Sequence, residues 1–222
     1  MSETPRIVAI IPAAGWSRRM GRPKQLIDVG GRPMLWRLAE TMAAVEGIAD
    51  VMIVTRCAII DALGASNDEL SNGKIRVVFN EDESSEMIDS IRVGLRACRE
   101  REDIAPRDGI LVCPGDYPGL TTAVFAACVG AYRADVSRVS GAGSAKASAN
   151  DRGSIIIASH GGRRGHPIIL PAELIPFVMS PACDGGLNAL TREFADRMQL
   201  VELPTDAVLR DADEPGDLPT NE

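Results

Sequence analysis

The sequence predicts an α/β protein with a Rossmann-like, doubly wound and mostly parallel sheet flanked by helices. Two observations support this fold class: apolar β-branched segments alternate with segments of helical periodicity, and no internal repeat or long linker interrupts the series. A hydrophobic fraction of 45% is enough for a packed core. A chain of 222 residues fits one α/β domain, which we expect over 1–222.

The elements follow in order along the chain. Segment 6–12 (RIVAIIP) is apolar almost throughout, as expected for a strand covered on both faces. Segments 33–45 and 87–100 have helical periodicity, and Pro33 suits a first helical turn. The other expected strands are 51–55, 75–79, 109–113, 154–159, 165–170 and 200–203, and the other expected helices are 121–132 and 188–197. Residues 137–153 are small, polar and aperiodic, which predicts a mobile surface loop.

Composition excludes several classes of protein. The net charge of −7 argues against a nucleic-acid binder, because phosphate neutralisation needs a basic excess. The apolar run 111–132 contains Asp116 and two prolines, so a membrane span is not expected, and Glu3 and Pro5 do not fit a signal peptide. Five cysteines without a CxxC pair indicate reduced, mostly buried thiols and a cytoplasmic protein, and two histidines make a structural zinc site improbable.

A glycine-containing basic loop, PAAGWSRRMGRPK (12–24), follows the first strand. In an open α/β sheet this loop lies at the carboxyl edge, where ligands bind. Gly15 and Gly21 allow a close backbone approach, exposed N–H groups bind anions, and Arg19 and Lys24 add charge, so a polyphosphate is the expected ligand. The spacing matches neither a P-loop nor GxGxxG. A solvated basic turn is the alternative.

Asp116 follows the expected strand 109–113 within CPGDYPG (113–119). It should therefore lie at the same sheet edge as the basic loop. A carboxylate beside phosphates is a natural Mg2+ ligand. The alternative is that Asp116 caps the helix starting near Thr121.

These segments resemble the MobA-like nucleotidyltransferases. IIPAAGWSRRMGRPKQLIDVGGRPML matches the family signature, and four later stretches match in order: DSIRVGL (89–95), PGDYP (114–118), GHPIIL (165–170) and DADEPGDL (211–218). Within the family, GHPIIL is most similar to the molybdenum cofactor cytidylyltransferases. The resemblance implies transfer of the CMP part of CTP to molybdopterin or a related phosphorylated acceptor, with Mg2+ as cofactor and release of pyrophosphate.

The resemblance also implies roles for individual residues. Main-chain and side-chain contacts to the nucleotide fall on Ala13, Ala14, Gly15, Ser17, Arg19, Lys24 and Ser90. Arg19, Lys24 and Asp116 form the expected catalytic set, Asp116 and Asp213 the expected metal ligands, with Asp211 as an alternative to Asp213. His166 is expected on the acceptor side. Ser90 as an ordinary helix residue, the acidic tail as a solvated segment and His166 as a packed turn residue remain alternatives.

The sequence says less about which nucleotide base and which acceptor molecule the protein would bind. The methyl group of Ala14 narrows the space beside the base and favours CTP over a purine nucleotide, while UTP stays open. The chain departs from the family pattern at Glu86, Asn188 and Glu214, and an asparagine cannot replace the charge of an acceptor-side arginine at 188.

Three other functions stay open because of these departures. One is a cytidylyl- or uridylyltransferase acting on a sugar or polyol phosphate, since PAAG and DSIRVGL also resemble the methylerythritol phosphate cytidylyltransferases. Another is a non-catalytic nucleotide-binding protein that delivers cofactor, with a molybdoenzyme or a second copy of the chain as partner. A dinucleotide reductase is the weakest alternative, because the required glycine fingerprint is missing.

Overall fold

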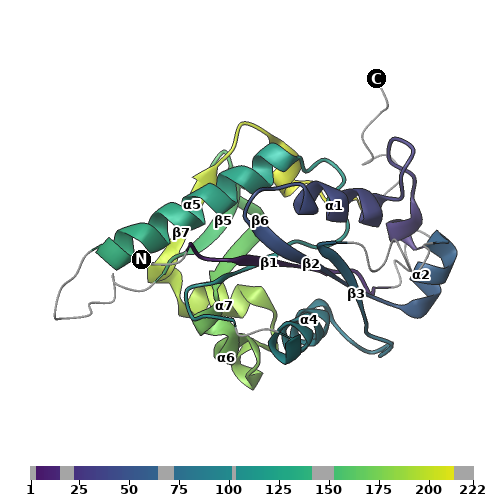
Figure 1. Ribbon diagram of the computed structural model, residues 1–222, viewed down its shortest axis with the longest axis horizontal. Helices are drawn as coiled ribbons and strands as arrows, with labels where there is room; N and C mark the ends of the chain where they lie inside the picture. The colour runs from purple at the N-terminus through teal and green to yellow at the C-terminus, as the bar shows by residue number, and fades with distance from the viewer. Residues whose placement is uncertain (1–3, 16–22, 65–72, 102–103, 142–152, 213–222) are drawn as a thin grey trace.

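The computed structural model describes residues 4–15, 23–64, 73–101, 104–141 and 153–212. Within them, one seven-stranded sheet has the order β3-β2-β1-β4-β6-β5-β7 (Figure 1). The strands are β1 Ile7–Pro12, β2 Ile48–Thr55, β3 Ile75–Phe79, β4 Gly109–Val112, β5 Ile155–His160, β6 Arg163–Pro171 and β7 Met198–Glu202. Only β6 runs antiparallel to its neighbours, β4 and β5. The predicted mostly parallel sheet is confirmed.

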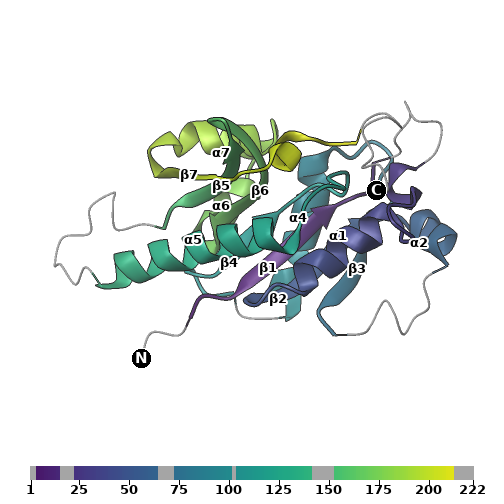
Figure 2. The same ribbon diagram turned by 90° about the horizontal axis from the view of Figure 1, so that it is seen from above.

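Helices cover both faces of this sheet. The α-helices are α1 Met34–Ala43, α2 Cys57–Leu63, α4 Met87–Arg101, α5 Thr122–Gly141, α6 Ile175–Val178 and α7 Leu187–Glu193. The 3-10 turns are η2 Lys24–Leu26, η4 Ala172–Leu174, η5 Pro181–Cys183, η6 Ala195–Arg197 and η7 Asp206–Leu209. α1 and α5 lie on one face, and α4, α6 and α7 lie on the other (Figures 1 and 2).

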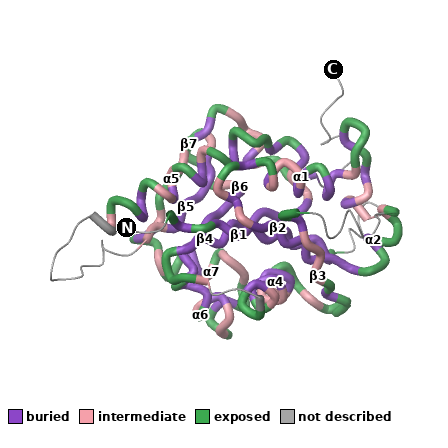
Figure 3. Tube along the Cα trace, in the orientation of Figure 1, coloured by how far each residue is buried: buried purple, intermediate pink, exposed green. Residues whose placement is uncertain are grey.

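The alternation of side chains along β1 explains the two cores. All six residues of β1 are buried, as Figure 3 shows for the centre of the sheet. Ile7, Ala9 and Ile11 pack in the cluster that includes α1 and α5. Val8 and Ile10 pack in the cluster that includes α4. A fully apolar strand is therefore the expected sequence for this central position.

A tight turn reverses the chain between β5 and β6. Gly161 and Gly162 have φ of 57° and 73°, and His160 pairs with Arg163 across them. Positive φ at both central residues is what a two-residue hairpin turn of this hand requires. The turn makes β6 the antiparallel strand and returns it beside β4.

Several predicted boundaries need correction. The helix expected at 121–132 extends to Gly141, so residues 137–141 of the expected mobile loop are helical, and 142–152 lie outside the described residues. The helix expected at 188–197 ends at Glu193 and is followed by the turn η6. Helix α2 was not predicted. The extent of the single domain over 1–222 stays a prediction.

Two expectations from composition can be compared with the structure. Cys98, Cys113, Cys128 and Cys183 are buried thiols, while Cys57 is exposed. Burial raises the pKa of Cys128 to about 12, so this thiol stays protonated at neutral pH. Among the described helices, none has the length and apolar character needed to cross a bilayer.

Gly165 lets the turn η7 pack directly on β6. A Cβ atom at this position would lie 2.0 Å from the carbonyl oxygen of Val208. We expect Gly165→Ala to destabilise the protein by about 1–3 kcal/mol, because backbone atoms must move apart. Thermal unfolding measures this, at roughly 2–4 °C per kcal/mol for a chain of this size.

Gly130→Ala is the matched control for that substitution. Gly130 lies within α5, and an added Cβ atom there would meet nothing within 4 Å. Alanine should raise helix stability at this site, by about 0.5–1 kcal/mol. An unchanged melting temperature for Gly165→Ala would contradict the close approach of η7 to β6.

Candidate active site at the carboxyl edge of the sheet

Residues that follow β1 and β4 lie side by side, because these strands are parallel neighbours. The pairing continues past the strands: the N–H of Gly115 donates to the carbonyl of Pro12 over 3.3 Å. A Cβ atom on Gly115 would lie 3.1 Å from the Cβ of Ala13. The segment after β4 therefore packs directly against the start of the basic loop, as the sequence predicted.

Lys24 and Asp116 meet at this edge. The Lys24 Nζ lies 2.5 Å from Asp116 Oδ2, and the two side chains are 18% and 17% exposed. Asp116 Oδ1 is buried and has no hydrogen-bond partner within the described part of the chain. The ion pair thus holds one carboxylate oxygen and leaves the other available to a further ligand.

The alternative role of Asp116 as a helix cap is wrong. α5 begins at Thr122, six positions further along the chain than Asp116. One carboxylate oxygen of Asp116 accepts a hydrogen bond from Lys24, and the other has no partner within the described residues. The carboxylate is therefore not used to satisfy the first turn of that helix.

The turn Ala13–Gly15 is fixed through its carbonyl groups. Gln25 Nε2 donates to the carbonyls of Ala13 and Gly15 over 2.9 and 2.8 Å. Thr55 Oγ1 donates to the carbonyl of Ala13 over 3.1 Å. The N–H of Ala13 donates to the carbonyl of Val54 over 2.8 Å. Because these side chains occupy the oxygens, the turn offers a ligand mainly the peptide N–H groups of Ala14 and Gly15, which suit an anion or an acceptor edge of a base.

Arg56 completes this arrangement and joins the turn to a second loop. Its Nε donates to the carbonyl of Ala14 over 2.7 Å. Its Nη1 and Nη2 donate to the carbonyls of Glu81 and Asp82 over 2.9 and 2.8 Å. The side chain is only 3% exposed. Arg56 therefore clamps the loops after β1 and β3 together with three charge-assisted hydrogen bonds.

Arg56 and Gln25 were missed in the sequence. Gln25 lies within the stretch quoted for the family signature, directly after Lys24, but an uncharged amide there gave no signal of its own. For Arg56 the signal was a charged residue directly after the strand expected at 51–55, at the sheet edge where ligands bind.

Ser90 lies near this second loop. It is buried in the first turn of α4, and its hydroxyl accepts a hydrogen bond from Asn80 Nδ2 over 3.1 Å. Asn80 Nδ2 also donates to Ser85 Oγ over 3.1 Å, and the backbone N–H of Asn80 donates to the carbonyl of Thr55 over 2.9 Å. The structure places Ser90 at the correct edge, and its contact with a nucleotide stays a prediction.

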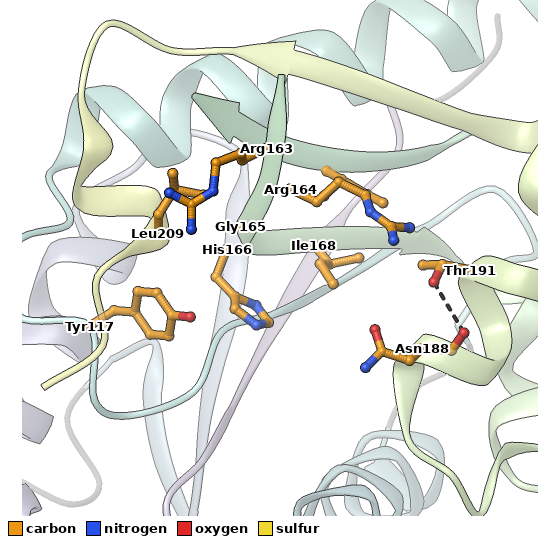
Figure 4. A pocket seen from close by; sticks show the side chains of 10 residues that line it. Tyr117, Arg163, Arg164, Gly165, His166, Ile168, Asn188, Thr191 and Leu209 are labelled. Atoms are coloured by element: carbon orange, nitrogen blue, oxygen red, sulfur yellow. Dashed lines mark hydrogen bonds between the residues drawn. The ribbon is translucent and has the colours of Figure 1, made fainter. Parts of the chain in front are cut away.

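His166 of β6, the strand that pairs with β4 on the side opposite β1, lines a pocket of about 260 Å³ (Figure 4). Its ring meets Tyr117 edge-to-face, with ring centroids 5.1 Å apart. Its Nδ1 is buried without a hydrogen-bond partner in the described chain. Burial lowers the pKa of His166, and the charge of Asp116 opposes this shift only in part, so the imidazole is neutral at pH 7. The pocket is lined by Tyr117, Ile157, Arg163, Arg164, Gly165, His166, Ile168, Asn188, Thr191 and Leu209.

Three candidate residues, Ser17, Arg19 and Asp213, lie outside the described residues. Ala212, next to Asp213 in the chain, is buried, and its N–H donates to the carbonyl of Asp116 over 2.7 Å. Asp211 is exposed. The described chain contains no group of three His, Cys, Asp or Glu side chains arranged to hold a metal ion.

The family is established by comparison with known sequences. The family model described as MobA-like NTP transferase domain matches residues 9–200. The chain belongs to this family. The match includes Lys24 and Asp116, so the edge at which they meet lies inside the family's domain.

The relatives of this MobA-like chain include one protein named an oxidoreductase and others named cytidylyltransferases. Nicotine blue oxidoreductase of Paenarthrobacter nicotinovorans is 29% identical over 214 residues, covering 96% of this chain and 94% of that protein. The 2-C-methyl-D-erythritol 4-phosphate cytidylyltransferase of Ralstonia nicotianae is 36% identical over 135 residues, covering 59% of this chain and 51% of that protein. The second match therefore spans about half of the cytidylyltransferase.

Solved structures confirm the predicted fold. The 4-diphosphocytidyl-2C-methyl-D-erythritol synthase of Anaerococcus prevotii has a TM-score of 0.68 at 19% identity, covering 96% of this chain and 93% of that one. The Mycobacterium tuberculosis protein Rv0371C, solved in complex with manganese, has a TM-score of 0.62 at 20% identity, covering 96% and 95%. At these identities the likeness concerns the fold.

Proposed function

We propose that this protein is a Mg2+-dependent nucleotidyltransferase that transfers the CMP part of CTP to a phosphorylated small-molecule acceptor and releases pyrophosphate. The observation that carries the proposal is the contact between Lys24 and Asp116 at the carboxyl edge of a MobA-like NTP transferase domain. Nucleotidyl transfer needs a cation that binds phosphates and a carboxylate that binds a metal, and Lys24 and Asp116 provide these two groups side by side.

The residues present fit a divalent metal. Asp116 Oδ1 is a buried carboxylate oxygen without a partner in the described residues, and Mg2+ binds through one or two carboxylates plus substrate phosphates. Asp213 is the proposed second ligand, with Asp211 as the alternative, because Ala212 is hydrogen-bonded to Asp116. When bound, the metal would neutralise charge on the phosphates. The manganese in Rv0371C supports a divalent ion in this fold.

The protein's own contribution is mainly positioning. Ala13, Ala14 and Gly15 hold the nucleotide through the backbone, with Ser17 and Ser90 assisting, and Arg19 and Lys24 bind its phosphates. An oxygen of the acceptor phosphate attacks the α-phosphorus, and the bond to the bridging oxygen breaks in line. Pyrophosphate leaves with the bonding electron pair, so no covalent intermediate with the chain is required.

The acceptor has two candidates. The resemblance at GHPIIL favours molybdopterin, whereas the partial cytidylyltransferase match favours a polyol phosphate such as 2-C-methyl-D-erythritol 4-phosphate. Both carry a phosphate nucleophile. A molybdoenzyme or homo-oligomer partner and a cytoplasmic location stay predictions.

A second function, the dinucleotide reductase that the sequence left open, is favoured by one observation. The relative that aligns over nearly the whole chain is named an oxidoreductase. The glycine fingerprint GxGxxG of dinucleotide-binding sites is nevertheless absent after β1. A non-catalytic nucleotide-binding protein is the third candidate.

One set of assays separates the three functions. Pyrophosphate release is measured with Mg2+, CTP, UTP or GTP, and either molybdopterin or 2-C-methyl-D-erythritol 4-phosphate as acceptor. Oxidation of NADH and NADPH is measured in parallel with nicotine blue, the dye in the name of the relative. We expect acceptor-dependent pyrophosphate release with CTP and no nicotinamide oxidation. CTP binding without turnover on either acceptor would favour the non-catalytic function, and dye-dependent NADPH oxidation would favour the reductase.

A further inference from the structure

The pocket around His166 is positively charged in an acidic protein. Its lining includes Arg163 and Arg164 but no Asp or Glu. The whole chain has a net charge of −7, so the positive charge of this lining is opposite in sign to that of the protein. A pocket of this composition favours an anionic ligand.

The two arginines differ from most other arginines described in the structure. Ion pairs with carboxylates occur at Arg6, Arg32, Arg76, Arg92, Arg138, Arg197 and Arg210. Within the described part of the chain, no carboxylate forms an ion pair with Arg163 or Arg164. Arg164 Nη1 instead lies 3.6 Å from the sulfur of Met198, a weak acceptor. Their two charges are therefore not compensated by the described residues.

The pocket also has neutral polar groups placed for hydrogen bonding. The pocket is lined by Arg163, Arg164, Gly165, His166 and Ile168 of β6. The register between β5 and β6 shifts in this stretch, so the regular alternation of side chains is interrupted there. Figure 4 shows Asn188 and Thr191 of α7 on the Arg164 side of His166, and Tyr117 on the Arg163 side. The charged rim, polar wall and apolar Ile168 together resemble the usual composition of a small-molecule site.

Its position connects the pocket to the proposed reaction centre. Tyr117 follows Asp116 in the chain and contacts the His166 ring. β6, which carries His166, pairs with β4 on the side opposite β1. A ligand in this pocket therefore lies near the carboxylate that we assign to the metal, and across β4 from the Ala13–Gly15 turn and Arg56, which follow β1 and β2.

We propose that this pocket is the acceptor subsite and binds a phosphate monoester dianion, with Arg163 and Arg164 supplying its positive charge. The inference rests on the proposed function, because it concerns the acceptor of that reaction. It also explains why the protein can have Asn188 where the family pattern has an acceptor-side arginine. The positive charge for the acceptor would come from the arginines of β6 instead of from a residue of α7. Two guanidinium groups match a dianion better than a carboxylate monoanion.

Inorganic phosphate is the probe, and its binding is measured by calorimetry without metal. Lys24→Met serves as the background, so that phosphate cannot use the Lys24 charge. Wild-type protein saturated with CTP is a second background in case Lys24→Met fails to fold. We expect saturable phosphate binding that weakens about tenfold to a hundredfold in the Arg163→Ala/Arg164→Ala variant. Arg163→Lys/Arg164→Lys should lose less, because it keeps the charge.

Arg99→Ala is the control, since Arg99 is an exposed arginine of α4 that does not line the pocket. It should bind phosphate as the background protein does. Acetate should bind more weakly than phosphate. Phosphate binding that is absent, equal to that of acetate or unaffected by the double alanine substitution would overturn the proposal. CTP binding is measured separately on the wild type, so a failure of the proposed nucleotide site is distinguished from a failure of this pocket.

Discussion

Replacing Asp116 with asparagine is expected to reduce pyrophosphate release from CTP by about a hundredfold to a thousandfold. The amide keeps the size of the side chain but removes the negative charge. Asp116 Oδ1, the buried oxygen without a described partner, then becomes a poor metal ligand, and Lys24 loses its ion pair. The measurement is steady-state turnover as a function of Mg2+ concentration.

Asp61→Asn is the matched control for this experiment. Asp61 is an exposed residue of α2, so the substitution changes net charge by the same amount away from the site. The control should retain wild-type turnover and the same Mg2+ dependence. Thermal unfolding of both variants checks that lost activity is not lost structure. Turnover by Asp116→Asn equal to that of the wild type would exclude a metal-binding role for this carboxylate.

The parts of the fold that follow from local sequence could be predicted. All six residues of β1 are buried, and the sequence of this segment is apolar throughout, as a strand covered on both faces requires. The direction of β6 could not be predicted, because it depends on the glycine turn at 161–162 and on pairing with β4, which are not local signals. The continuation of α5 to Gly141 was missed because small polar residues such as Ser137 and Ser140 weaken helical periodicity without ending the helix.

The candidate site was predictable where a topological rule connects distant residues. Lys24 and Asp116 are 92 positions apart, yet both follow neighbouring parallel strands, so the carboxyl-edge rule brings them together. Arg56 was not predictable in the same way. Its role depends on three backbone carbonyls whose positions only the folded chain defines. Motifs identify side chains that touch a ligand better than side chains that hold the backbone around it.

Arg56→Gln is expected to raise the KM for CTP about tenfold or more while changing kcat less. The guanidinium holds the carbonyls of Ala14, Glu81 and Asp82, and glutamine cannot replace three donors or their charge. The loops after β1 and β3 would then lose their fixed spacing, and the nucleotide would have to restore it on binding. The protein should also be destabilised, by about 3–5 kcal/mol, because buried carbonyls lose their partners.

Two further variants separate positioning of the loops from general stability. Tyr132→Phe removes a buried hydroxyl that donates to the carbonyls of Arg107 and Asp108, both over 3.0 Å, at the opposite edge of the sheet. It should lower the melting temperature and leave the KM for CTP unchanged. Arg56→Lys keeps the charge without the fork of donors, so its KM should lie between those of the wild type and Arg56→Gln. If Arg56→Gln and Tyr132→Phe affected stability but neither changed the KM for CTP, Arg56 would be a structural residue only. The loops after β1 and β3 would then be held in place by other contacts.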